Sequence, residues 1–546
     1  MSFKKMNSTT AVNNTRLIAT GILLFTAFLF LFNIGKRDLW APDEPRYAQV
    51  SKEMRDTGNF VVPHLNSAPY PDKPPLLFWV INLFSLPFGK ITALSSRLPS
   101  AFAGIGCCLA IFYFGKRLHR NTRIGLLSAL ILATSTKFLW MAHRVAFDVL
   151  LTFFVTMAII CFQKGYTEQK NAGRYYILFY VCMALGVLTK GPVGLILPFG
   201  VVVTYLILKK DVKTLKETQP WIGGMLFVLI VFTWVCMAGV YGGKAYTYQI
   251  LFNQNVGRFA SSFAHQRPFY YYFIYFPVNF LPWSVFIPSI AMFLASSKGR
   301  KKIRDLLLPL VWFGVVFVFF SIVSGKRDIY VLPLYPAASL LTAWFLNEFI
   351  EQVREKSFKK MGYYPCFFLC GLSLVSGICL PVVVYSIYPR YLSLAIPLAV
   401  ILFLGGIFLL RLIKHARIIP FLFILFFMIL IIFNLSTLKV IPVLNQYKSA
   451  REICDKANSV IKPGERLALY NFFRDPYLFY TDRNYLEIIQ GVDNLRQFLN
   501  GQERVFLFIQ EKDFKEVSKF SEIAVFALAK DSVGHRDVIL VSNRDK

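Results

Sequence analysis

The segment LWAPDEPRYAQ, residues 39–49, places two acids, an arginine and a tyrosine close together: Asp43, Glu44, Arg46 and Tyr47. A carboxylate can act as a general base or hold an acceptor in position, and an arginine can make a planar, bidentate contact with a phosphate. The apolar run LIATGILLFTAFLFLFNIG directly precedes the segment. We therefore expect a chemically active loop where the chain leaves a membrane.

Polar side chains of the same kinds recur at the ends of later apolar runs. They are Asp72 and Lys73 in YPDKPPL, Asp148 in HRVAFD, Lys190 in LTKGP, Arg258, His265 and Arg267 in the stretch 241–268, and Lys326, Arg327, Asp328 and Tyr330 in SGKRDIYVLPLYP. Cations gathered with one or two carboxylates at a membrane boundary suit a lipid ligand that carries a phosphate.

Each of these residues also has a structural interpretation. A lysine or arginine at the end of a span commonly reaches to the lipid headgroups, and Asp148 near a helix N-terminus would stabilise it by about 0.3–1 kcal/mol. His265 alone fits a structural role, and Trp40 and the FYYYF run at 269–273 fit an interfacial aromatic belt. The combination favours a site, because the positive-inside rule predicts few basic residues on the outer face.

The composition indicates a polytopic α-helical membrane protein. Of the 546 residues, 56% are hydrophobic, against about 45–50% in soluble domains, and long apolar runs recur along most of the chain. Much of the net charge of +30 sits in short loops, so the positive-inside rule explains it better than nucleic-acid binding. Eight of the nine cysteines lie in apolar runs, where we expect them to pack, and the lone Cys454 excludes a disulfide framework in the C-terminal region.

Alternating basic loops predict about thirteen transmembrane helices, the first of them retained and not cleaved as a signal peptide. We place them near 17–34, 98–115, 124–141, 146–163, 175–190, 192–208, 220–240, 269–294, 306–323, 329–348, 364–386, 391–411 and 418–436. The run at 74–89 is short and begins with two prolines, so we expect an interfacial or re-entrant helix there. An odd number of spans places the C-terminus, and the polar residues above, outside the cytoplasm.

Residues 440–546 have a different pattern. Short β-rich runs, RLALYNF, RVFLFIQ, IAVFALA and DVILVSN, alternate with helical stretches such as YKSAREICDKANSVI. This alternation predicts a small α/β domain on the outer side. The expected organisation is an all-α transmembrane domain over 1–439, with an outer loop at 35–97, followed by the α/β domain over 440–546.

The long segment WAPDEPRYAQVSKEMRDTGNFVVPHLNSAPYPDKPPLLFW closely resembles the first outer loop of the lipid A aminoarabinose transferases. LTKGPVGLILP, HQRPFYYYFIYFPVNFLPWS and GKRDIYVLPLYPAASLL resemble later blocks of this family in the same order. The resemblance covers roughly residues 17–345, whereas the C-terminal domain corresponds only in its placement. These enzymes belong, with the protein O-mannosyltransferases, to the GT-C class of membrane glycosyltransferases.

The resemblance implies a sugar donor linked to undecaprenyl phosphate, used at the periplasmic side of the bacterial inner membrane, and lipid A or another envelope acceptor. Asp43 matches the family's essential first-loop aspartate, Lys73 the lysine that holds the carrier phosphate, and Asp148 a second aspartate; these three are the predicted catalytic residues. The predicted substrate-binding residues are Arg46, Tyr47, Lys190, Arg258, Arg267, Lys326, Arg327 and Tyr330.

The family also suggests that the acid before the lysine pairs with a histidine around a structural metal ion such as zinc. Here that acid is Asp72, where the family usually has glutamate, and the histidine is His265. No cofactor is expected to take part in the reaction. The sequence has no Walker-type GxxxxGK[ST] motif and no GxGxxG after a strand, which fits a lipid-linked donor that needs no cytoplasmic nucleotide.

The predicted reaction is a displacement at the anomeric carbon, with the carrier phosphate as leaving group. Lys73, Arg267 and either Lys326 or Arg327 would stabilise the charge on that phosphate. Asp43 either removes a proton from an acceptor hydroxyl or aligns an ionised acceptor phosphate, and we favour alignment. We expect Glu44 to be a partner of Arg46 or a helix-start residue.

Three other functions remain as alternatives. A protein O-mannosyltransferase is the nearest, and transfer to a peptide would identify it. A transporter of an anionic lipid or sugar would place its polar residues near the bilayer midplane, whereas here they gather at one face. A scaffold membrane protein would need no such cluster.

Overall fold

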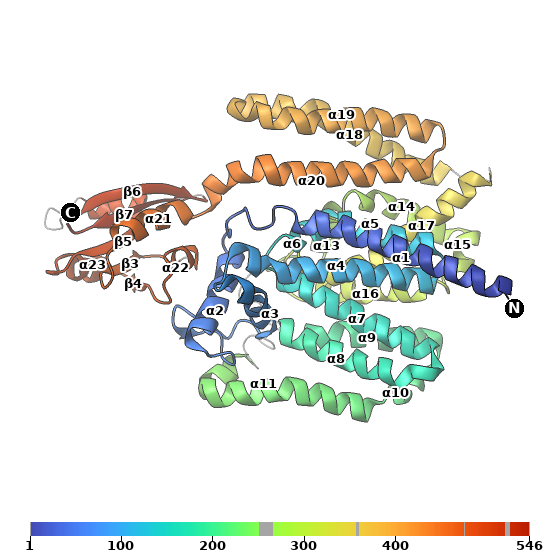
Figure 1. The fold of residues 1–546 in the computed structure, drawn as a ribbon, viewed down its shortest axis with the longest axis horizontal. Coiled ribbons are helices and arrows are strands. Elements are labelled where there is room, and N and C mark those ends of the chain that lie inside the picture. The colour runs from blue at the N-terminus through green and yellow to red at the C-terminus, as the bar shows by residue number, and fades with distance from the viewer. Residues whose placement is uncertain are drawn as a thin grey trace. The chain divides into compact units, whose positions relative to one another are not determined.

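The computed structural model describes residues 2–250, 266–355, 360–473, 475–518, 525–534 and 536–544. The chain forms two compact units (Figure 1). The first consists of Met1–Phe32, Asp72–Leu77 and Leu98–Thr437, and the second of Asn33–Pro71, Phe78–Arg97 and Leu438–Lys546. The second unit thus joins most of the predicted outer loop to the C-terminal region. The division into functional domains at 439/440 stays a prediction.

The first unit is built from apolar helices. Their bounds are α1 (Ser2–Leu31), α4 (Ala93–Leu118), α5 (Thr122–Thr134), α6 (Thr136–Ala142), α7 (Phe147–Thr167), α8 (Ala172–Lys190), α9 (Val193–Lys209), α10 (Thr214–Glu217), α11 (Pro220–Tyr248), α13 (Tyr271–Asn279), α14 (Ile287–Ala295), α15 (Ser297–Lys302), α16 (Leu307–Ile322), α17 (Tyr335–Arg354), α18 (Tyr363–Ile387), α19 (Leu392–Lys414) and α20 (Ile418–Lys448). Their interiors are rich in Leu, Ile, Val and Phe, which suit a helix whose surroundings are apolar on all sides.

Among the described residues, eight helices are long and apolar enough to cross a membrane, or up to ten if each bent pair counts as one span. The two bent pairs are α5 with α6, at 68°, and α13 with the segment Trp283–Ala295, at 115°. The other three of the thirteen predicted spans correspond to α9 and α16, which are short, and to α17. The apolar stretch Leu76–Phe88 is also short, which agrees with the predicted non-spanning helix.

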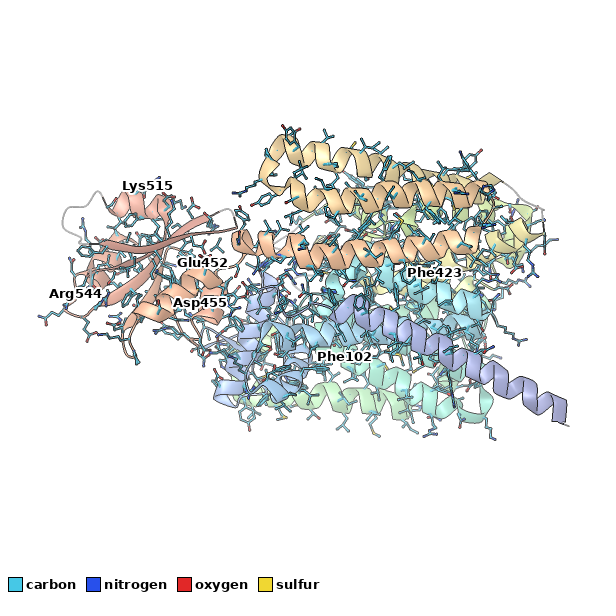
Figure 2. All side chains as sticks on the ribbon, turned by 45° about the horizontal axis from the view of Figure 1, so that its top comes forward. Phe102, Phe423, Glu452, Asp455, Lys515 and Arg544 are labelled. Atoms are coloured by element: carbon cyan, nitrogen blue, oxygen red, sulfur yellow. The ribbon has the colours of Figure 1, made fainter. Side chains whose placement is uncertain are left out.

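Large apolar side chains on the outside of these helices suit lipid. Phe102 on α4 is 47% exposed and Phe423 on α20 is 61% exposed (Figure 2). Trp221 at the start of α11 is 89% exposed. Water-soluble proteins rarely expose apolar surface on such a scale. The helices and their surfaces together make the chain a multi-pass membrane protein.

The second unit contains the loop elements α2 (Asp43–Thr57), β1 (His64–Leu65) and β2 (Ala68–Pro69), and most of α3 (Leu76–Ser85). Its C-terminal part contains α21 (Arg451–Val460), β3 (Arg466–Tyr470), α22 (Asp475–Tyr480), β4 (Glu487–Ile489), α23 (Val492–Leu499), β5 (Val505–Gln510), α24 (Glu511–Val517), β6 (Phe526–Val533) and β7 (Arg536–Ser542). Each of the four predicted β-rich runs contains a strand within its described residues, residues 523–524 lying outside them, and β4 is a further strand that was not predicted.

The C-terminal strands form one five-stranded sheet in the order β4-β3-β5-β7-β6. β3 is parallel to β4 and β5, with Ala468 paired to Glu487 and to Leu507. β5 and β6 pair antiparallel with β7. Parallel neighbours need a crossover, and helices α22 and α23 lie between these strands in the sequence. The expected small α/β domain is therefore present.

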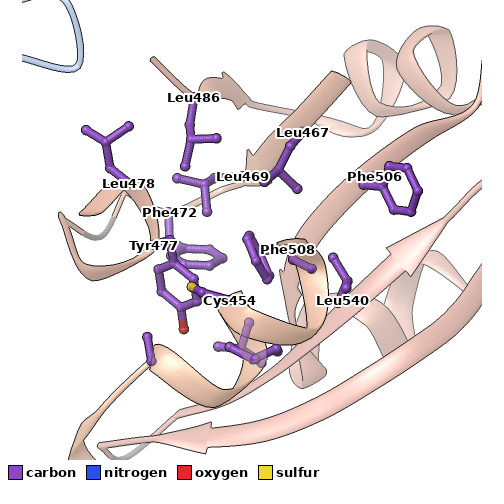
Figure 3. Packing of buried hydrophobic residues seen from close by; sticks show 14 residues of the cluster. Cys454, Leu467, Leu469, Phe472, Tyr477, Leu478, Leu486, Phe506, Phe508 and Leu540 are labelled. Atoms are coloured by element: carbon purple, nitrogen blue, oxygen red, sulfur yellow. The ribbon is translucent and has the colours of Figure 1, made fainter. Parts of the chain in front are cut away.

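One face of this sheet packs against α21 and α22. Cys454 of α21 is fully buried beside Leu469, Tyr477 and Phe508 (Figure 3), and the Tyr477 and Phe508 rings lie 4.9 Å apart between centroids. Burial raises the pKa of the Cys454 thiol well above its usual value. Cys454 is free and fills space in the core, as a small apolar residue does.

Candidate active site

Asp43 is the first residue of α2, so its carboxylate lies at the positive end of the helix dipole. Glu44 follows in the same first turn, and Gly58 ends the helix in a left-handed conformation, with φ 69°. Asp43 is half-buried, whereas Glu44 has no exposed surface. The two adjacent acids therefore occupy different environments, and of the two only Asp43 is partly accessible to solvent.

Glu44 is held by two arginines. Its Oε2 accepts a hydrogen bond from Arg37 Nη1 at 2.8 Å, and its Oε1 accepts one from Arg97 Nε at 2.8 Å. The backbone N–H of Trp40 donates to the same carboxylate at 3.1 Å. The expectation that Glu44 pairs with Arg46 was wrong, because these two buried arginines take both of its oxygens. The alternative expectation, that Glu44 is a helix-start residue, is confirmed.

Arg97 also binds the chain that leads into this loop. Its guanidinium donates to the carbonyl oxygens of Ile34, Arg37 and Asp38 at 2.6–2.8 Å. These carbonyls follow the end of α1 and have no partner in a continuing helix. Arg97 thus fixes the backbone that approaches Asp43. Arg97 was not among the predicted site residues; its available signal was a charged residue at the start of an apolar run, in SSRLPSAF.

Arg46 makes an ion pair with a residue of the C-terminal region. Its Nε lies 3.0 Å from Asp475 Oδ2, at the start of α22. Burial alone would lower the pKa of Arg46, but the negative charge of Asp475 and smaller contributions from Tyr70, Tyr47 and Asp43 raise it overall. Arg46 is therefore held protonated. Because Arg46 Nε is directed at Asp475, this contact orients the Arg46 guanidinium group. Arg46 follows Asp43 closely in the sequence.

Trp40 is a structural residue and not part of an aromatic belt. It is 4% exposed, and its indole N–H donates to Asn445 Oδ1 at 2.8 Å. The Arg37 guanidinium carbon lies 4.6 Å from the ring centroid, a cation–π arrangement. The interpretation as a membrane-interface tryptophan was therefore wrong. In the FYYYF run, by contrast, Phe269 and Phe273 are 71% and 62% exposed while Tyr272 is buried.

A third acid on α2, Glu53, organises the hairpin that follows the helix. Its carboxylate accepts the backbone N–H groups of Asn66 and Ser67 at 2.9 and 3.0 Å. Both residues have positive φ, 57° and 62°, in the turn between β1 and β2. Glu53 is 1% exposed, so this turn is held from inside. The hairpin ends at Pro69, shortly before Asp72 and Lys73 in the chain.

In the first unit, three predicted site residues from different segments lie together. The Lys190 ammonium, at the end of α8, pairs with Asp148 in the first turn of α7. The same ammonium lies 4.3 Å from the centroid of the Tyr330 ring. The side chains of Lys190 and Asp148 are 12% and 7% exposed. Asp148 thus lies at a helix N-terminus and also belongs to a charged cluster, so both interpretations of its sequence position apply.

Three further predicted cations of this unit, Arg267, Lys326 and Arg327, sit on two paired loops. Gln266 and Gly325 form an isolated antiparallel bridge, and the N–H of Arg267 donates to the Ser324 carbonyl at 3.3 Å. Lys326 is 3% exposed and donates to the carbonyls of Arg267 and Val323 at 3.1 and 2.6 Å. Lys326 therefore holds the two loops together.

Arg267 and Arg327 carry the accessible charge of these two loops. Arg267 is exposed and Arg327 half-buried. Tyr272 donates its hydroxyl to the Arg327 carbonyl at 3.0 Å, which fixes the backbone at that position. The guanidinium groups therefore extend from a backbone that is held at several points.

The structure gives less detail for the remaining predicted site residues, Asp72, Lys73, Arg258 and His265. Asp72 and Lys73 are half-buried in the loop before α3. Arg258 and His265 lie outside the described residues. Among the residues that are described, no three His, Cys, Asp or Glu side chains lie close enough to hold a metal ion. Because His265 is not among them, the zinc site on Asp72 and His265 stays a prediction.

Known proteins similar to this chain fall into one class. A family model described as dolichyl-phosphate-mannose-protein mannosyltransferase matches residues 17–247. An uncharacterized protein from Aquifex aeolicus (strain VF5) is 31% identical over 465 residues, 85% of this chain and 86% of that protein. The undecaprenyl phosphate-alpha-4-amino-4-deoxy-L-arabinose arabinosyl transferase of Pectobacterium carotovorum subsp. carotovorum (strain PC1) is 28% identical over 398 residues, 72% of this chain and 70% of that enzyme.

Two solved structures share the fold. ArnT from Cupriavidus metallidurans, bound to undecaprenyl phosphate, matches with a TM-score of 0.81 at 20% identity, covering 97% of this chain and 98% of that one. The archaeal oligosaccharyltransferase AglB from Archaeoglobus fulgidus matches with a TM-score of 0.50 at 10% identity, over 91% of this chain and 69% of that one. The fold and the family match define a GT-C membrane glycosyltransferase. Within that class, the chain belongs to the same family as the Aquifex protein, and it is similar to the undecaprenyl-phosphate-aminoarabinose transferases.

Proposed function

We propose that this glycosyltransferase moves a sugar of the aminoarabinose class from undecaprenyl phosphate to lipid A or another envelope acceptor, at the periplasmic face of the bacterial inner membrane. The observation that carries the proposal is the cluster of Asp148, Lys190 and Tyr330. Three segments far apart in the sequence bring an ammonium, a carboxylate and an aromatic face together at helix ends, as recognition of a charged lipid headgroup requires. Relatives that carry this activity by name support the same substrate class.

The donor would bind through its phosphate. Lys190 has three N–H donors, of which Asp148 takes one, so the ammonium can bridge that carboxylate and a phosphate oxygen. Arg267 and Arg327 would add planar, bidentate contacts. Lys73 is the proposed ligand of the leaving phosphate. Lys326 supports the loops from inside, and its contact with the substrate stays a prediction.

In the reaction, the bond between the anomeric carbon and the carrier phosphate oxygen breaks, and its electron pair stays on the phosphate. An acceptor oxygen forms the new bond to the same carbon. Cations around the leaving phosphate stabilise the negative charge that develops there, which lowers the barrier. If the acceptor is a phosphate, its oxygen is already ionised and alignment is sufficient; if it is a hydroxyl, its proton passes to a base.

Asp43 is the proposed acceptor-side residue. It lies at the first position of α2 on a backbone that the Glu44–Arg97–Arg37 cluster fixes. Rigid support of this kind matters because a small displacement of a reacting group lowers the rate strongly. Tyr47 is buried and supports the helix, so Arg46 is the stronger candidate for a substrate contact among the two.

Mass spectrometry tests the proposal in cells. Lipid A and envelope glycans from cells with and without this protein are compared, and a sugar on lipid A that depends on the protein is expected. The family-model match over residues 17–247 makes protein O-mannosylation the second candidate. Mannose on peptides, with lipid A unchanged, would favour that candidate and contradict the first.

A further inference from the structure

The second unit contains a polar cavity whose residues have no assigned role in the proposed reaction. Its volume is about 550 Å³, and its walls come from the C-terminal half of α2, the loop at 89–93, α21 and the end of α22. The cavity therefore lies where the outer loop meets the C-terminal domain. A volume of this size accommodates a sugar headgroup.

Two cations in the wall have no acidic partner among the described residues. Arg55 and Lys90 both line the cavity, and neither takes part in an ion pair within the described part of the chain. The Nη1 group of Arg55 is buried and makes no hydrogen bond. A buried donor without an acceptor is costly, and such groups in folded proteins usually meet a ligand or an ordered water.

The other charges around the cavity are already paired. Lys52 lies 3.2 Å from both Asp56 and Asp482, and Arg451 lies 3.2 Å from Asp38 and 3.5 Å from Asp455. Asp455 is 61% exposed on α21 (Figure 2). Each carboxylate retains lone pairs that can accept hydroxyl hydrogens. The wall thus offers two cations for an anion and several acceptors for hydroxyl groups.

Three residues that line the cavity lie close in the sequence to the ends of long apolar helices. Ala93 begins α4, and Arg451 follows the last residue of α20, Lys448, by three positions. Asp38 follows Leu31, the last residue of α1, by seven. All three helices are long and apolar enough to cross a membrane. A ligand anchored in the bilayer can therefore reach the cavity with its headgroup.

We propose that this cavity binds the phosphorylated sugar headgroup of a membrane lipid. The phosphate contacts Arg55 and Lys90, and sugar hydroxyls donate to the surrounding carboxylates. A phosphate monoester carries a charge of about −1.5 to −2 at neutral pH, which two cations match. Taking this lipid to be the acceptor of the transferase rests on the proposed function, whereas its binding does not.

Binding is measured on the full-length protein in detergent by native mass spectrometry. The probes are lipid A with two phosphates, lipid A stripped of its phosphates, and inorganic phosphate as competitor. The double variant R55Q/K90Q is expected to lose about tenfold in affinity for phosphorylated lipid A, since charged hydrogen bonds are lost. The matched control K456Q/K462Q removes two exposed lysines of the C-terminal domain and is expected to bind as the wild type does.

Several outcomes would overturn the inference. Equal binding of phosphorylated and stripped lipid A by the wild type would contradict recognition of the phosphate. An equal loss of affinity in R55Q/K90Q and in the control K456Q/K462Q would contradict a specific role for Arg55 and Lys90. If inorganic phosphate at the same concentration as the lipid displaced lipid A completely, the cavity would bind anions in general and not a lipid headgroup. If Arg55→Gln disturbs folding, the single variant Lys90→Glu, which changes an exposed residue, is used for the same binding measurement. Binding of undecaprenyl phosphate, measured in parallel, distinguishes failure here from failure of the proposed transferase function.

Discussion

The side chains of Arg97 and Glu44 form an ion pair with no exposed surface, with Arg97 Nε 2.8 Å from Glu44 Oε1. Arg37 completes the pairing from the other side at 2.8 Å. Burying charges is costly unless each is paired and hydrogen-bonded, and here the donors also reach backbone carbonyls. This pair thus fixes the first turn of α2, on which Asp43 lies.

Removal of the Glu44 carboxylate should destabilise the protein strongly. Glu44→Gln leaves Arg37 and Arg97 buried without a compensating charge, which typically costs about 3–5 kcal/mol. Thermal unfolding in detergent measures the effect. The control Asp493→Asn changes a fully exposed acid and should leave the transition unchanged. Equal unfolding temperatures for Glu44→Gln and the wild type would contradict a structural role for this pair.

Asp43 should be needed for transfer but not for folding. Asp43→Asn keeps the size of the side chain and removes its charge, so we expect sugar transfer to be abolished while the unfolding temperature stays close to that of the wild type. Lys73→Ala should behave in the same way, because it removes the proposed ligand of the leaving phosphate. A fully active Asp43→Asn protein would exclude the base role and most of the positioning role.

Arg46 and Asp475 should be coupled energetically. In a double-mutant cycle with Arg46→Ala and Asp475→Ala, we expect a coupling of about 1 kcal/mol, since Asp475 is buried but Arg46 is partly exposed. Transfer activity should fall in each single variant, because the guanidinium loses its orientation. Additive effects on stability, with unchanged transfer in Asp475→Ala, would show that this contact does not position Arg46.

The Lys190 cluster should govern binding of the donor carrier. Tyr330→Leu removes the aromatic face and should weaken binding of undecaprenyl phosphate by about 0.5–2 kcal/mol, whereas Tyr330→Phe keeps the face and should bind normally. Lys190→Met removes the ammonium and should have the largest effect. The affinity of the purified variants for undecaprenyl phosphate is measured. Unchanged binding in both Tyr330→Leu and Lys190→Met would exclude this cluster from the donor site.

The sequence predicted the fold well where apolar runs and alternation are strong. Eight long apolar helices and the four β-rich runs of the C-terminal domain are present. The count of thirteen spans exceeds the eight described helices that are long and apolar enough, because α9 and α16 are short, two spans are bent pairs of helices, and α17 is not among those eight. Charge alternation fixes the side of a loop, but it contains no information on helix length or bending.

The sequence predicted the site only in part, for a physical reason. Asp148, Lys190 and Tyr330 each stood out as polar residues at the ends of apolar runs, and the structure brings them together. The partners Arg97 and Asp475 lie 53 and 429 positions from Glu44 and Arg46. Such pairs depend on the tertiary fold, so local spacing assigned Glu44 to its neighbour Arg46 instead.

The central claim is tested most directly by transfer with purified components. The full-length protein is reconstituted in liposomes with undecaprenyl-phosphate-linked aminoarabinose and lipid A, and the products are analysed by mass spectrometry. We predict lipid A that carries the transferred sugar, together with released undecaprenyl phosphate, and neither product with Asp43→Asn. Unmodified lipid A in the presence of folded wild-type protein and intact donor would contradict the claim.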